Sequence, residues 1–223
     1  MQEKQEKISQ TWGYSGEVGS WNMELIGANS SKPEERFQNL IDIIKRIIPP
    51  LRELHTLHKI DFDLAVLGNS ITEEGKIEEK EFFEFVELSA STLNEVIPAF
   101  EQLSSTYSRF IITRISMELN TKIKEDWNKE IIAPESAELY ISTDSDALVG
   151  KKDEIYVSYS TYIDVWLQKT LKSGVPRDNT NTAKFNYHRL ERFLFTLEKS
   201  LGGNFKKGES YHYNDCLQRI GFA

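Results

Sequence analysis

Two long stretches of the chain carry apolar residues at the spacing of a helix that buries one face. Pro33 suits a first helical turn, and the apolar positions that follow it are Phe37, Leu40, Ile41, Ile44, Ile47 and Ile48. Pro49 and Pro50 should break that helix, which should continue as a shorter one through Leu51, Leu54 and Leu57. A last helix is predicted by Tyr187, Leu190, Leu194, Leu197 and Leu201, and Gly202 should end it.

Shorter segments between these helices alternate apolar and polar residues, as half-buried strands do. The alternation predicts strands at 22–26, 60–66, 82–88, 110–119, 139–142 and 155–167. Thr92 and Glu95 form a capping-box pattern, which predicts another helix through Leu103. Residues 1–21 show no sustained period, and we expect them to form a loose N-terminal arm.

The predicted elements indicate the fold class. From residue 22 to residue 119 their order is strand, helix, strand, strand, helix, strand, which is the order of a ferredoxin-like unit. We therefore predict an α+β fold: an antiparallel sheet with helices on one face, a ferredoxin-like first half, and a smaller sheet-plus-helix second half. The expected lobes are 22–130 and a second β/α lobe at 131–223 that packs on the first, so that the chain is one globular unit.

Composition narrows the choice of partners. The 223 residues include 35 acidic and 27 basic side chains, so the net charge is −8. This balance disfavours nucleic acids and anionic membrane surfaces, and it favours a basic protein partner. The sequence has no run of 18 apolar residues, no apolar signal region at its start, and a single cysteine, Cys216. We therefore expect a cytoplasmic protein that does not bind a membrane.

Candidate catalytic chemistry is sparse. His55 and His58 lie three residues apart on the expected helix, and Asp61 and Asp63 share one face of the next strand. These four residues are the first set to test as an enzyme or metal site, but metalloprotease spacing, a nucleophile elbow and a phosphate loop are absent from the sequence. Asp144 and Asp146 begin a segment like a calcium loop that lacks its glycine, so a turn is the better interpretation. We expect no catalytic residue, cofactor or metal ion.

The densest acidic run of the chain predicts an exposed hairpin tip. Such a tip is commonly only solvated, but a negative protrusion also steers a protein towards a basic surface. Aromatic residues gather in the last strands, where they either pack the sheet or anchor an interface. The candidate partner-binding residues are therefore Glu73, Glu74, Glu78, Glu79, Glu81, Asp144, Asp146, Tyr156 and Trp166.

Near the end of the chain, a D-x-W-L strand is followed by an N-x-x-R-L-E helix. The positions that match are Asp164, Trp166, Leu167, Asn186, Arg189, Leu190 and Glu191. In these motifs the chain resembles a group of uncharacterised bacterial proteins suspected to be immunity proteins of toxin systems. The resemblance implies a non-catalytic protein that neutralises a cognate toxin by direct binding. The residues themselves leave two alternatives open, an accessory subunit of a bacterial assembly and an enzyme of unrecognised type.

Overall fold

A computed structural model describes residues 14–28, 30, 32–74, 76–87, 90–106, 110–143, 154–172 and 175–222. Six strands form one antiparallel sheet in the order β1-β6-β5-β4-β2-β3. Their bounds are Tyr14–Ile26 (β1), His55–Ile71 (β2), Ile77–Glu87 (β3), Phe110–Lys124 (β4), Glu130–Thr143 (β5) and Glu154–Ile163 (β6). A separate hairpin joins β7 (Lys169–Lys172) to β8 (Val175–Asp178).

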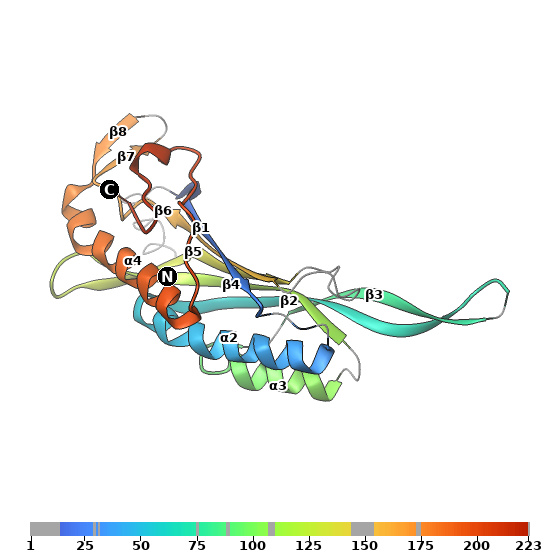
Figure 1. Ribbon diagram of the computed structural model, residues 1–223. Helices are drawn as coiled ribbons and strands as arrows, with labels where there is room; N and C mark the ends of the chain where they lie inside the picture. Colours follow the sequence, from blue (N-terminus) through green and yellow to red (C-terminus); the bar gives the residue numbers. More distant parts are fainter. Residues whose placement is uncertain are drawn as a thin grey trace.

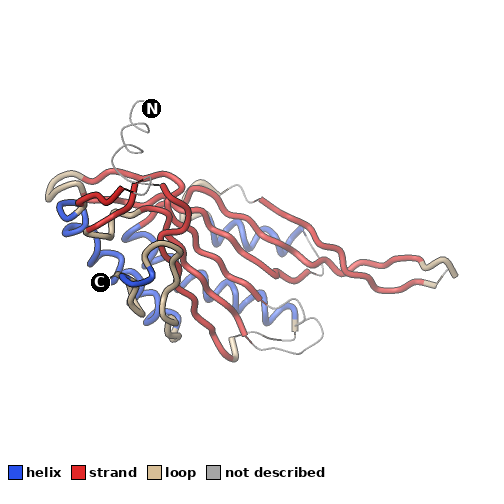
Figure 2. Tube along the Cα trace, turned by 90° about the horizontal axis from the view of Figure 1, so that it is seen from above, coloured by secondary structure: helices blue, strands red, loops and turns tan. Residues whose placement is uncertain are grey.

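Three helices lie on one face of the sheet (Figures 1 and 2): α2 (Pro33–Leu54), α3 (Val96–Thr106) and α4 (Thr180–Leu201). The core lies between the two layers, because alternate strand residues such as Met117 and Leu139 are fully buried against helix residues such as Ile44 and Leu190. The predicted α+β class, with an antiparallel sheet and helices on one face, is confirmed.

The ferredoxin-like pairing of the first half is wrong, although the order of its elements is right. β1 does not pair with the other strands of that unit but with β6, where Trp21 lies opposite Tyr159. The reason is that β4, β5 and β6 continue the sheet as a meander, and β1 joins the free edge of β6. A boundary at residue 130 therefore does not separate two sheets.

The prediction of a loose N-terminal segment at residues 1–21 is wrong for residues 14–21, which belong to β1. Residues 1–13 lie outside the described part of the chain. Trp21 is fully buried because the C-terminal tail, from Asn204 to Phe222, packs along β1. The tail forms backbone bridges from Glu209 to Ser20 and from Phe205 to Met23, and it ends after the short helix η2 (Asn214–Cys216). It covers the outer edge of the sheet.

The expected break at Pro49 and Pro50 does not occur. α2 continues through both prolines to Leu54, and the shorter helix through Leu57 does not form because β2 begins at His55. The two prolines deprive only the carbonyls of Lys45 and Arg46 of their helical donors, and both of these residues are exposed to water. Ile47 and Leu51 on the same turns are fully buried, so packing of the apolar face outweighs the lost hydrogen bonds.

β2 and β3 extend well beyond the body of the protein (Figures 1 and 2). β2 pairs with β4 only as far as Val66, whereas its ladder with β3 continues to the pair Ile71 and Ile77. We call residues 67–81 the arm. At about 3.3 Å per residue, the ladder of the arm projects roughly 16 Å past the last β4 pair.

Candidate functional site

The four residues expected as an enzyme or metal site do not converge. Both histidines lie in β2, not on a helix; His55 is buried in the core, whereas His58 is 41% exposed with Nε2 3.4 Å from a Glu135 carboxylate oxygen. Asp61 and Asp63 are paired with cations: Asp61 lies 3.1 Å from Lys59 Nζ, and Asp63 lies 2.8 Å from Arg114 Nε. In the described ranges, no three His, Cys, Asp or Glu side chains are grouped to hold a metal ion.

His55 instead belongs to a buried polar network. Its Nε2 lies 3.2 Å from the Tyr159 hydroxyl and its Nδ1 lies 3.3 Å from Thr121 Oγ1, while Phe193 of α4 packs edge-on against the imidazole. Complete burial lowers the pKa of His55 to about 3 and raises the pKa of Tyr159. Both side chains are therefore neutral and enclosed, which suits a structural role.

Of the two aromatic residues predicted to bind a partner, Trp166 lies in the core and Tyr156 lies on the open face of the sheet. Trp166 is 1% exposed and its indole donates to Thr161 Oγ1 at 3.0 Å, so it belongs to the core and offers no surface to a partner. Tyr156 is half-buried on the open face of the sheet, where its hydroxyl donates to Glu154 at 2.6 Å. Asp144 and Asp146 lie outside the described residues.

The open face of the sheet, which the helices do not cover, carries polar side chains that form hydrogen bonds with one another. Both carboxylate oxygens of Glu138 accept hydrogen bonds, from Ser116 at 2.7 Å and from the Tyr162 hydroxyl at 2.9 Å. Partial burial and the adjacent Glu138 carboxylate raise the pKa of Tyr162. This cluster is satisfied internally and therefore gives little indication of a ligand.

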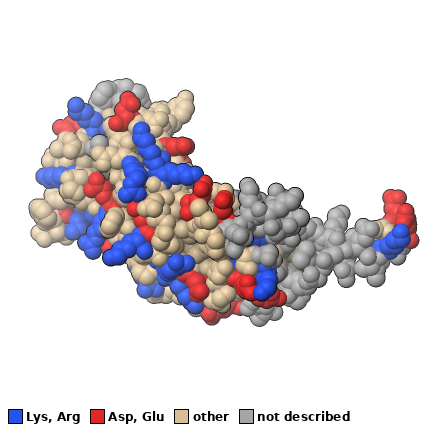
Figure 3. Space-filling view, viewed as in Figure 1, with Lys and Arg blue, Asp and Glu red and all other residues tan. Residues whose placement is uncertain are grey.

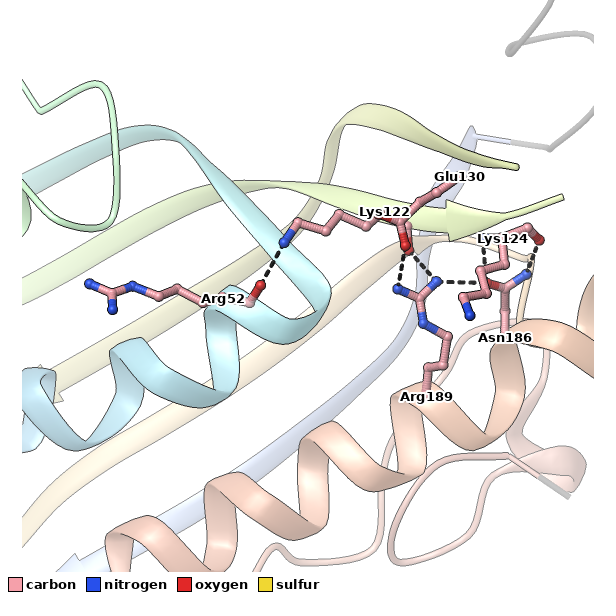
Figure 4. A network of polar contacts seen from close by, with 6 residues as sticks. All are labelled: Arg52, Lys122, Lys124, Glu130, Asn186 and Arg189. Atoms are coloured by element: carbon pink, nitrogen blue, oxygen red, sulfur yellow. Dashed lines mark hydrogen bonds and ion pairs between the residues drawn. The ribbon is translucent and has the colours of Figure 1, made fainter. Parts of the chain in front are cut away.

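The N-x-x-R motif attaches α4 to the end of β4 (Figure 4). The Asn186 amide donates to the Lys124 carbonyl at 2.8 Å and accepts from the Lys124 N–H at 2.9 Å. Arg189 donates to the Lys122 carbonyl at 2.8 Å and pairs with Glu130 at 2.9 Å. These two residues of the resemblance are thus placed to hold the helix on the sheet.

The acidic run lies on the arm. Glu73 and Glu74 are exposed in its turn, which is closed by a 2.8 Å hydrogen bond from the Thr72 N–H to the Lys76 carbonyl. Glu78, Glu79 and Glu81 belong to β3, the edge strand. Figure 3 shows acidic side chains at the far end of the arm. Near its base, β3 also exposes two aromatic rings, Phe82 and Phe85.

A second candidate site is a cavity of about 460 Å³ at the opposite end of the sheet from the arm, which we call the α4 cavity. Three elements form its walls: the end of α2, the β4–β5 hairpin and α4. The lining residues are Glu53, Leu54, Lys124, Trp127, Lys184, Phe185, His188, Arg189, Arg192 and Phe193. No sequence motif predicts this site; the one signal for it is that Lys184, His188 and Arg192 recur every four residues and so share one helix face.

The α4 cavity is basic although the chain is acidic. It has the cations Lys124, Lys184, Arg189 and Arg192, and Figure 3 shows basic side chains over the α4 side of the body. Its mouth carries Trp127, which is 81% exposed and whose indole lies edge-to-face with Phe185 at 5.1 Å between ring centroids. An exposed tryptophan beside clustered cations is a typical feature of a binding surface.

In the part of the chain that the structure describes, no helix combines the length and the apolar character needed to span a bilayer. Comparison with known proteins gives no assignment: no protein family matches the chain, and neither a curated protein nor a solved structure matches it.

Proposed function

We propose that this chain is a protein-binding protein that uses the β2–β3 arm to hold a basic partner, and that this partner is a toxin domain which the chain neutralises in the cytoplasm. The observation that carries the proposal is the arm itself. Among the described residues, the two strands pair beyond Val66 only with each other, yet they continue to Ile71 and Ile77. An isolated two-stranded ribbon is at best marginally stable in water, so a partner that adds contacts to it would explain its length.

The charge of the arm supports a basic partner. Glu73 and Glu74 are exposed at its tip, and the whole chain carries a net charge of −8. Complementary charge accelerates association and discriminates against wrong partners. The exposed rings of Phe82 and Phe85 supply apolar area at the base of the same strand, where an interface would have its anchors.

A purely protective role of the acidic residues is the competing explanation. Charged side chains on an edge strand prevent the edge from pairing with other chains, and β3 is the edge of this sheet. The two explanations differ in what charge reversal does. Reversal at the tip should weaken the binding of a basic partner at least about tenfold, whereas a protective charge of either sign serves equally well.

The experiment measures complex formation with the product of the adjacent gene by calorimetry. We expect a nanomolar complex with the unaltered chain, and affinity at least about tenfold weaker for Glu73→Lys/Glu74→Lys. The matched control is Glu34→Lys/Asp42→Lys on α2, which makes the same change in net charge at exposed positions away from the arm. Absence of a complex, or equal affinities of both double variants, would refute the proposal.

A further inference from the structure

The α4 cavity carries positive charge and exposed aromatic surface, neither of which the proposed function of the arm requires. Four cations line it, whereas two carboxylates oppose them: Glu53, which lies 3.6 Å from Arg192, and Glu130, which lies 2.9 Å from Arg189. The cavity therefore keeps an excess of two positive charges on a protein whose net charge is −8. Positive charge so concentrated against the overall balance favours an anionic ligand.

Two of these cations are placed to contact a ligand. Two hydrogen bonds with the Asn186 amide, one donated and one accepted, hold the backbone of Lys124. Figure 4 shows no contact from the Lys124 ammonium to the other residues drawn. The Lys184 ammonium lies 4.9 Å from the centroid of the Phe185 ring and makes only a long, 3.5 Å contact with Asn181. Both ammonium groups are thus positioned at the cavity without a close carboxylate among the described residues.

The exposed side chain of Trp127 indicates that the ligand also contains a planar ring. Trp127 sits on the turn of the β4–β5 hairpin, and its indole keeps 81% of its surface exposed although Phe185 touches it. A planar ring that stacks on this indole would cover apolar surface that the fold leaves in water. Base stacking on exposed aromatic residues beside a basic groove is the usual way in which proteins hold nucleotides without reading their sequence.

We infer that the α4 cavity binds a nucleotide, with the base stacked on Trp127 and the phosphates on Lys124 and Lys184. The cavity of about 460 Å³ has the size of sites that take small organic ligands. The nucleotide is either a free molecule or one unit of a single-stranded nucleic acid, because both present the same base and phosphate. This inference is independent of the proposed function, since the cavity and the arm lie at opposite ends of the sheet.

The test titrates the full chain with ATP, adenosine, tripolyphosphate and a single-stranded oligonucleotide, followed by calorimetry and tryptophan fluorescence. We expect ATP to bind and to quench the tryptophan fluorescence, and we expect this quenching to be lost in Trp127→Ala. Trp21 and Trp166 are buried, and the fourth tryptophan, Trp12, lies outside the described residues. Adenosine lacks the phosphates and tripolyphosphate lacks the base, so each should bind at least about tenfold more weakly than ATP. An oligonucleotide that binds more tightly than ATP identifies nucleic acid as the source, and equal affinity identifies the free nucleotide.

Single substitutions locate the site. Trp127→Ala and Lys184→Gln should each weaken the binding of ATP about tenfold, because one removes the stacking surface and the other a phosphate partner. Lys199→Gln is the matched control, since it removes an exposed charge from the same helix outside the cavity. The inference is overturned if ATP and the oligonucleotide both fail to bind at millimolar concentration. It is also overturned if tripolyphosphate binds as well as ATP, or if the two cavity variants bind like Lys199→Gln.

Discussion

The side-chain amide of Asn186 bonds both backbone groups of Lys124, donating to the carbonyl at 2.8 Å and accepting from the N–H at 2.9 Å. Asn186 is fully buried in α4, and Lys124 is the last residue of β4. At that point β4 is paired with β5 on one side only, because its ladder with β2 ends at Thr121. The amide thus replaces the missing strand neighbour and positions the wall of the α4 cavity.

Replacing Asn186 by alanine should lower the free energy of unfolding by about 2–3 kcal/mol, because two backbone groups of Lys124 lose their partner and buried space opens. Urea denaturation monitored by circular dichroism measures the change. Asn181→Ala is the control, since Asn181 is exposed in the first turns of the same helix, and it should change the stability by less than about 0.5 kcal/mol. Equal effects of the two substitutions would contradict the role of the amide.

Stability should fall as the solution is acidified below about pH 6.5, because of His55. The pKa of His55 is lowered by burial from 6.5 to about 3, so the unfolded chain binds a proton in this range and the folded chain does not. Proton binding to the unfolded state alone costs up to about 1.4 kcal/mol of folding stability per pH unit in this window. Above pH 6.5 the contribution is constant, since the imidazole is neutral in both states.

His55→Gln isolates this effect. The amide keeps polar groups near Tyr159 and Thr121 but does not titrate, so its stability should decline less steeply between pH 6.5 and 4 than that of the unaltered chain. Carboxylates contribute equally to both proteins and cancel in the difference. If the two stability curves run parallel over this range, the buried imidazole is not the cause of the acid sensitivity.

The packing of the C-terminal tail against the sheet should depend on one buried carboxylate, that of Glu198. Glu198 of α4 is 6% exposed, accepts a hydrogen bond from the Phe205 N–H at 2.6 Å, and is paired with Arg219. Glu198→Ala should cost about 2–3 kcal/mol, because it leaves the buried Phe205 N–H without a partner. Arg219→Ala should cost less, since the guanidinium is half exposed and the carboxylate keeps its bond to Phe205.

Hydrogen exchange tests where Glu198 acts. The Ser20 N–H bonds to the Glu209 carbonyl of the tail at 2.9 Å, so its exchange should accelerate in Glu198→Ala more than exchange in the β4–β5 ladder. A uniform acceleration across the sheet would mean that the substitution lowers global stability and does not release the tail.

Two adjacent glycines should respond to alanine for different reasons. A Cβ at Gly203 would lie 2.5 Å from Met23 Sδ and 2.8 Å from Leu25 Cδ2, so Gly203→Ala should cost about 2 kcal/mol through steric overlap. A Cβ at Gly202 meets nothing within 4 Å, but φ is +74°, and Gly202→Ala should cost about 1 kcal/mol through backbone strain. Thermal unfolding of both variants measures these costs.

A second substitution separates the two causes. Met23→Ala removes the sulfur that a Cβ at Gly203 would overlap, so it should reduce the cost of Gly203→Ala. It should leave the cost of Gly202→Ala unchanged, because that cost comes from φ. Additive effects of Met23→Ala and Gly203→Ala would exclude steric overlap with Met23 as the cause.

The part of the candidate binding surface that consists of residues close together in the sequence could be predicted. The acidic run from Glu73 to Glu81 predicts an exposed hairpin tip, and Glu73 and Glu74 do lie in the turn of a hairpin. Glu78, Glu79 and Glu81 instead belong to strand β3. The α4 cavity could not be predicted, because Glu53, Trp127 and Lys184 come from three segments that only the packed fold brings together. Trp166 is a candidate partner-binding residue by its type, but the strand predicted at 155–167 ends at Ile163, and Trp166 lies buried in the turn that follows, where its indole bonds to Thr161.

The α+β class and the apolar faces of α2 and α4 follow from the amino-acid sequence, because the helical period of apolar residues is a local property. The partners of the strands, and the conformation at residues whose local preference conflicts with the fold, depend on contacts between distant segments. Pairing of β1 with β6 joins segments more than a hundred residues apart, which no local period encodes. Pro49 stays helical because the apolar residues of the same helical turns are buried. Glu135 adopts a φ of 48° where the register of the β4–β5 ladder shifts, and its N–H donates to the Asn120 side chain at 3.0 Å.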